Sequence, residues 1–147
     1  MTLAGASFLA HGADQGNDMK QMADHLAFMG YACTIEDEGK KLQCTTDKPT
    51  PNFTVRQQNL GFLIAAIFKG NEQAKEQRAA FLNLVNEFNI LSIATRYYVD
   101  KDTDLALEVW LPGGYRRDDF TNAIDNFNND WSRVVSKHEP ELKKFIK

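Results

Sequence analysis

The residues from Ile93 to Leu111 constrain the fold more than any other stretch of the chain. Apolar and polar side chains alternate on both sides of an acidic corner at positions 100, 102 and 104, which is the pattern of two half-buried strands joined by a tight turn. A loop of residues 101–103 fixes the register, because it places Val99 opposite Leu105, Tyr97 opposite Leu107 and Arg96 opposite Glu108. A shift by one residue would turn the core leucines to the other face. The stretch therefore predicts a β-hairpin.

The same acidic corner has a second interpretation, the start of a calcium-binding loop. An EF-hand loop that begins at Asp100 needs glycine at its sixth position and an acidic ligand at its twelfth. The sequence has Leu105 and Leu111 there, and the alternation continues without a break. We expect Asp100, Asp102 and Asp104 to bond to the turn backbone, with no metal or cofactor bound.

A second hairpin is predicted around a two-residue turn at Glu38-Gly39. In that register Ile35 faces Leu42, Cys33 faces Cys44, and Glu36 meets Lys41 on the other side. A two-residue turn makes the cysteines a hydrogen-bonded pair, with Cα atoms about 5.5 Å apart. In a reducing cytosol we expect two buried thiols, whereas an exported protein would make a disulfide plausible.

Two further strands are expected in "NFTVRQQ" and "GFLIAAIFKG", with the turn at residues 59–61 between them. The two prolines of "DKPTPN" rule out a central strand in that segment and indicate a connection.

Apolar residues recur at helical spacing in three other segments. The first follows residue 17 and ends at Gly30, and the second follows a cap at Asn71. The inner face of the second is expected to comprise Phe81, Leu82, Val85 and Phe88. The third starts near Phe120, and Pro140 should end or kink it near residues 137–139. The Asn and Asp residues of "RRDDFTNAIDNFNNDWSR" are interpreted as the solvated side of this last helix.

These segments predict an α+β fold: an antiparallel sheet of about five to six strands with three main helices, in the order α-β-β-β(β)-α-β-β-α. At 147 residues the chain can bury a core without metal or disulfides. We expect residues 1–16 to be a loosely ordered leader and residues 17–147 to be one domain. No basic residue precedes the short apolar stretch of the leader, so we expect a cytoplasmic protein, although an exported form whose native signal had been removed would look the same.

No motif for catalysis is present. The chain has no G-x-S-x-G, P-loop, G-x-G-x-x-G or H-E-x-x-H, and its three histidines are distant from one another in sequence. The net charge of −3 gives no global basic field for nucleic acid, and no apolar run approaches the roughly 20 residues of a membrane span. We therefore expect no catalytic, cofactor-binding or metal-binding residues, and neither nucleic acid nor membrane as a partner.

The candidate site residues lie on the sheet face opposite the leucines. Strand alternation puts Tyr98 and Trp110 there, together with the pair of Arg96 and Glu108. A helix could cover this face, which would make these residues a second core layer. An exposed face would instead be a contact surface for a protein partner or a second subunit. A third interpretation is a small-ligand or enzymatic site around Arg96, Glu108 and Tyr98, which requires a cleft with shifted pKa values.

The stretches "LAFMGYACTIEDEG", "NFTVRQQNLGFLIAAIFKG" and "LVNEFNILSIATRYYVDKDTDLALEVWLPGGYRRDDFTNAIDNFNNDW" resemble the YbjN-domain family. This family is described as candidate bacterial sensory transduction regulators. The resemblance covers about Met22 to Trp131, and it consists of the following turn and core positions: Gly30-Tyr31, Asn86, Asn89, Arg96, Tyr98, Asp100 to Asp104, Leu105, Leu107, Phe120 and Phe127. At Thr103 family members often have glycine, so a strained turn is expected.

The resemblance implies a type III secretion chaperone-like fold. It also implies a non-enzymatic bacterial protein that is often dimeric and acts through protein–protein contacts. The family supplies no catalytic residue to transfer to this sequence.

Overall fold

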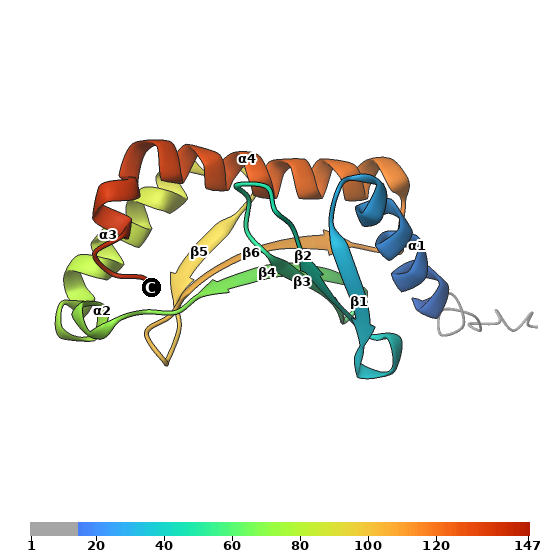
Figure 1. Cartoon of the computed structure of the whole chain (residues 1–147), viewed down its shortest axis with the longest axis horizontal. Helices are drawn as coiled ribbons and strands as arrows, with labels where there is room; N and C mark the ends of the chain where they lie inside the picture. Colours follow the sequence, from blue (N-terminus) through green and yellow to red (C-terminus); the bar gives the residue numbers. More distant parts are fainter. Residues whose placement is uncertain (1–14) are drawn as a thin grey trace, which may run out of the picture.

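The computed structural model describes residues 15–147, which form a six-stranded antiparallel sheet with its helices on one side (Figure 1). The helices are α1 Gln15–Phe28, α2 Glu72–Glu76, α3 Arg78–Leu91 and α4 Arg117–Leu142. The strands are β1 Ala32–Glu36, β2 Lys41–Thr45, β3 Phe53–Gln58, β4 Gly61–Phe68, β5 Arg96–Val99 and β6 Leu105–Pro112, in the spatial order β1-β2-β3-β4-β6-β5. The predicted α+β class and element order are confirmed. The expected leader lies outside the described residues except at positions 15 and 16, which already belong to α1.

Both hairpin registers agree with the sequence. Strand β5 pairs with β6 through Arg96↔Glu108, Tyr97↔Leu107 and Val99↔Leu105. Strand β1 pairs with β2 through Cys33↔Cys44, Ile35↔Leu42 and Glu36↔Lys41. The acidic corner is a backbone turn, since Asp100 Oδ1 accepts hydrogen bonds from the N–H groups of Asp102 and Asp104, each at 2.9 Å. Thr103 adopts φ 67°, a left-handed conformation that favours glycine. This agrees with the strained turn expected where the family often has glycine.

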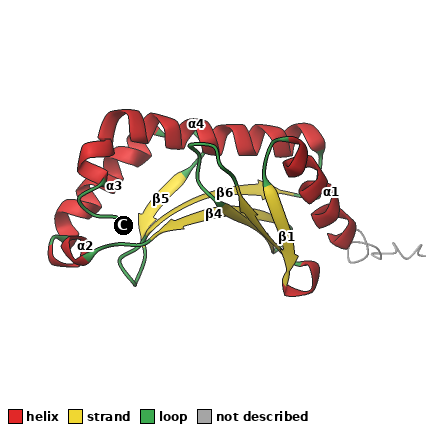
Figure 2. Ribbon diagram, in the orientation of Figure 1, coloured by secondary structure: helices red, strands yellow, loops and turns green. Residues whose placement is uncertain are grey.

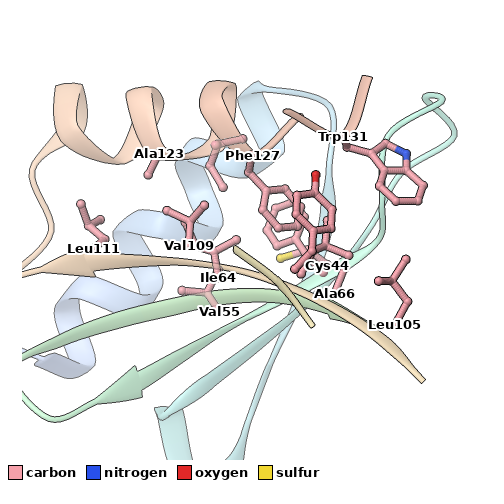
Figure 3. Packing of buried hydrophobic residues seen from close by; sticks show 14 of the residues in the cluster. Cys44, Val55, Ile64, Ala66, Leu105, Val109, Leu111, Ala123, Phe127 and Trp131 are labelled. Atoms are coloured by element: carbon pink, nitrogen blue, oxygen red, sulfur yellow. The ribbon is translucent and has the colours of Figure 1, made fainter. Parts of the chain in front are cut away.

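The core lies between the sheet and the helices. Figure 3 shows Ile64, Val109 and Leu111 of the sheet pointing toward Ala123 and Phe127 of α4. Together with the buried side chains of α1 and α3, these residues form one apolar cluster. All helices thus share a single face of the sheet (Figure 2), and no helix of residues 15–147 lies on the other face.

Two helix predictions were wrong in detail. Leu82 is 44% exposed, because Phe81, Val85 and Phe88 already form the buried stripe of α3 and Leu82 points about 100° away from it. Helix α4 continues through Pro140 to Leu142. The proline costs one backbone bond in the last turns, whereas buried Leu142 and Phe145 hold this end of the chain against the core.

The segment before β5 also differs from the prediction of a strand that begins at Ile93. Ser92 caps the end of α3, Ile93 is 76% exposed, and pairing begins only at Arg96. The reason is Asp130 of α4, whose carboxylate accepts the N–H groups of Ile93, Ala94 and Thr95 at 2.8 to 3.0 Å. Asp130 is 1% exposed, so the interpretation of the Asn and Asp residues of α4 as a solvated face was wrong for this one.

The two cysteines form a disulfide, which is the alternative expected for an exported protein and not the pair of thiols expected in a reducing cytosol. Their Cα atoms are 4.1 Å apart, which is the spacing of a non-hydrogen-bonded pair and not the expected 5.5 Å. The turn explains the difference, because pairing stops at Glu36↔Lys41 and the loop has four residues, 37–40, where two were predicted. Hydrogen-bonded and non-hydrogen-bonded pairs alternate along the hairpin, so the longer loop exchanges the two types at every pair.

We expect the disulfide to contribute about 2 to 3 kcal/mol to the free energy of unfolding. It joins residues that are 11 positions apart and so lowers the conformational entropy of the unfolded chain. Urea unfolding of the wild type and of the double variant Cys33→Ser, Cys44→Ser measures this contribution. A dithiol reductant should lower the wild type to the level of the variant and leave the variant unchanged. A reductant with no effect on the wild type would show that the bridge does not stabilise the fold.

Candidate functional site

The uncovered side of the sheet, here called the open face, carries side chains in rows that run across the strands, and three of these rows contain the candidate site and its neighbours. Strand register sets the rows, because opposed residues share a face. The first row is Glu36, Lys41, Arg56, Leu63 and Trp110; the second is Thr34, Gln43, Thr54, Ala65, Glu108 and Arg96; the third includes Ile67, Ala106 and Tyr98.

Large apolar side chains on this face are in contact with solvent. Trp110 is 53% exposed, Ile67 60% and Tyr98 38%. The indole of Trp110 lies across the neighbouring strand at Gly61, where a Cβ atom would be 3.0 Å from the indole Nε1. The same Cβ would be 2.4 Å from the backbone carbonyl oxygen of Leu111, so glycine at position 61 makes room for the backbone of β6 as well as for the tryptophan. Of the two alternatives left open by the sequence, the structure shows the uncovered face.

The polar residues of the predicted site lie together at one side of this face. Both oxygens of Glu108 are occupied: Arg96 Nε donates to Oε2 at 2.9 Å, and the Tyr98 hydroxyl donates to Oε1 at 2.7 Å. The Arg96 guanidinium also lies over the Tyr98 ring, 5.6 Å from its centroid. Arg96 itself is 72% exposed, whereas the Glu108 side chain is 10% exposed.

The electrostatics of this cluster follow from these contacts. Partial burial, followed by the hydrogen bond to Glu108, raises the pKa of Tyr98 to about 12. The hydrogen bond and negative charge of Glu108 also raise the pKa of Arg96. A tyrosine with such a pKa is poorly matched to proton transfer near neutral pH. The three side chains satisfy one another and connect β5 to β6, whereas the apolar side chains beside them remain exposed.

Two shallow hollows adjoin on the open face. One, of about 520 Å³, is lined by Arg56 and Ile67 among others, and the second, of about 500 Å³, by Arg96 and Trp110. Both include Leu63 and Glu108. Sequence reasoning missed Arg56 and Leu63 as members of this face. The alternation in "NFTVRQQ" and "GFLIAAIFKG" could have identified them, because Arg56 follows buried Val55 and Leu63 precedes buried Ile64. Neighbouring residues of a strand point to opposite faces of the sheet.

One feature is absent from residues 15–147: no group of three or more His, Cys, Asp or Glu side chains is arranged to hold a metal ion. In the same part of the chain, no helix has the length and apolar composition to cross a membrane.

Comparison with solved structures finds that this architecture is similar to the crystal structure of YbjN from E. coli, a protein described as a candidate transcription regulator. The two structures superpose with a TM-score of 0.66 over 89% of this chain and 94% of YbjN, at 12% sequence identity. The chain has the YbjN fold. This agrees with the resemblance seen in the sequence. No protein-family model matches the sequence, and no curated protein matches it either.

At 12% identity the likeness to YbjN establishes the arrangement of helices and strands. The main side chains of the open face come from four adjacent strands of this fold. These are Arg56 on β3, Leu63 on β4, Trp110 on β6 and Tyr98 on β5. The candidate site is therefore built on paired strands and not on loops.

Proposed function

We propose that this chain is a non-enzymatic regulatory or chaperone-like bacterial domain that binds protein through its open face, either a second copy of itself in a dimer or another protein. The observation that supports this function is the exposure of Trp110, Ile67 and Tyr98 on a face that no helix of residues 15–147 covers. Exposed apolar patches of this kind occur at protein contacts, and Trp, Tyr and Arg are the residues that contribute most to binding energy at such contacts.

The relation to YbjN agrees with this proposal, since a regulator acts through macromolecular contacts. The open face favours protein over nucleic acid as the partner, because it carries Glu36 and Glu108 as well as its cations and its centre is apolar. The closed hydrogen-bond set of Arg96, Tyr98 and Glu108 suits a structural link between β5 and β6 better than a catalytic group.

The test is a comparison of the wild type with Trp110→Ala by size-exclusion chromatography with light scattering, together with capture of partners from lysate. We expect the wild type to form a dimer or to retain a partner, and Trp110→Ala to weaken that association at least about tenfold. Ile90→Ala is the matched control, because Ile90 is 68% exposed on α3, away from the open face. A wild type that stays monomeric, captures no protein and behaves like Trp110→Ala would refute the proposed function.

A further inference from the structure

The open face carries one positive charge that the described residues do not neutralise. Lys41 is paired with Glu36, with Nζ 2.8 Å from Oε2, and Arg96 is paired with Glu108. Arg56 is the third cation of the face, and within residues 15–147 its guanidinium has no carboxylate or hydrogen-bond partner. Three cations thus stand against two carboxylates on a chain whose overall charge is −3.

The position of Arg56 makes this charge costly to the isolated chain. Strand register sets Arg56 directly opposite Lys41, and like charges at opposed positions destabilise a sheet. Glu36 of β1 neutralises Lys41, and β2 separates it from Arg56 of β3. An incoming carboxylate would relieve the repulsion and gain a bidentate partner, since the guanidinium group matches carboxylate geometry.

Apolar surface begins immediately beside the cation. On the other side of Arg56, register places Leu63, and beyond Leu63 lies Trp110. Arg56, Leu63 and Ile67 line the same hollow of about 520 Å³. A ligand that reaches Arg56 therefore also covers the apolar part of the open face.

The spacing of this row specifies the ligand further. Adjacent strands lie about 4.8 Å apart, so Leu63 is about 5 Å and Trp110 about 10 Å from Arg56 along the row. Successive turns of an α-helix rise about 5.4 Å, so side chains at i, i+4 and i+7 of one helix face repeat at nearly the same interval. Acidic residues at one end of such a face would meet Arg56, and apolar residues would meet Leu63 and Trp110.

We propose that the open face binds an acidic, amphipathic helical segment of a protein partner, with a carboxylate on Arg56 and apolar side chains on Leu63 and Trp110. This inference rests on the proposed function and names the class of partner. It predicts that binding at the face depends on negative charge as well as on apolar area.

The first experiment uses two fluorescent dyes with the full-length protein. The anionic dye anilinonaphthalene sulfonate carries both features of the ligand, and Nile red is an uncharged apolar probe. Arg56→Gln should weaken binding of the anionic dye about fivefold and leave Nile red unchanged. Trp110→Ser should weaken both dyes. Lys137→Gln removes one exposed cation from α4 and is the matched control, which should bind both dyes as the wild type does.

The second experiment displaces the dye with a designed helical peptide that carries Glu, Leu and Leu at i, i+4 and i+7, and with its Glu→Lys counterpart. The acidic peptide should displace the dye at a concentration about five times lower, and Arg56→Gln should remove that difference. Equal displacement by the two peptides, or anionic-dye binding that Arg56→Gln does not change, would overturn the inference.

The outcomes separate this inference from the proposed function. If neither dye binds and light scattering shows a dimer that Trp110→Ala dissociates, a second copy covers the face; the inference then fails and the proposed function stands. If Trp110 substitutions change neither association nor dye binding, both fail.

Discussion

Replacing Asp130 with alanine will lower the free energy of unfolding by about 4 kcal/mol. The Asp130 side chain is 1% exposed and accepts hydrogen bonds from three consecutive backbone N–H groups, those of Ile93, Ala94 and Thr95. Alanine leaves the N–H of buried Thr95 without a partner and releases the backbone of Ile93 and Ala94, and it also removes the ion pair with Arg133 at 2.7 Å. Urea unfolding followed by circular dichroism measures the change.

Asp125→Ala is the matched control for this prediction, since Asp125 lies on the exposed side of the same helix. It should change the free energy of unfolding by no more than about 0.5 kcal/mol. A loss at Asp130 no larger than the loss at Asp125 would show that the α4 carboxylate does not hold the segment before β5.

The same carboxylate gives stability a defined dependence on pH. Burial alone would raise the pKa of Asp130, but the hydrogen bonds from the backbone of Ala94, Ile93 and Thr95 outweigh burial and hold its pKa below the ordinary value. Because this pKa is lower in the folded state than in the unfolded state, the stabilisation is present above the unfolded pKa of about 3.9 and is lost as pH falls through the folded value. The stability difference between the wild type and Asp130→Asn should therefore shrink below about pH 4.

The sequence was sufficient for the elements whose determinants are local. The alternation around residues 100–104 predicted the register of β5 with β6, and the opposed charges of Glu36 and Lys41 predicted the register of β1 with β2. Asn71 caps α2 as expected, since its Oδ1 accepts the Ala74 N–H at 3.0 Å. In each case, residues a few positions apart along the chain decide the structure.

Features that depend on distant segments were not predicted. Asp130 has the spacing of the buried stripe of α4, three residues after Phe127 and four before Val134, but a carboxylate is ordinarily solvated. Only the approach of residues 93–95 makes it a buried acceptor. Alternation predicted that the two cysteines lie opposite each other. It did not predict the four-residue turn, which brings their Cα atoms to 4.1 Å and so allows the disulfide. Periodicity assigns side chains to a face but does not say what packs against it.

The candidate site divides in the same way. Alternation correctly placed Trp110, Tyr98, Arg96 and Glu108 on one face of the sheet. Whether that face was covered depended on the side to which each helix packs, a property of the whole chain. Arg56 became part of the site only when β3 was seen to pair next to β4, which brings it beside Leu63.

Replacing Gly70 with alanine will lower the free energy of unfolding by a similar amount, about 4 kcal/mol. A Cβ atom at position 70 would lie 2.0 Å from the carbonyl oxygen of Thr103 and 3.0 Å from its carbonyl carbon. Both atoms are backbone, so no side-chain rotation can relieve the contact. The Gly70 N–H also donates to Asp104 Oδ1 at 2.9 Å, a bond to a buried carboxylate that a displaced backbone would lose.

The corner that faces Gly70 is held from several directions, which is why it will not yield to the added methyl group. Asp104 also binds Lys69 at 2.6 Å, and Thr103 accepts a hydrogen bond from Arg78 at 3.0 Å while keeping its left-handed conformation. Gly114→Ala provides the comparison, because its Cβ would meet only the end of the Asp18 side chain, at 3.3 Å. It should cost less than about 1 kcal/mol in the same urea experiment. Equal losses of unfolding free energy for the two variants would mean that the acidic turn moves to accommodate the methyl group. The turn would then not fix this end of the sheet, on which the open face is built.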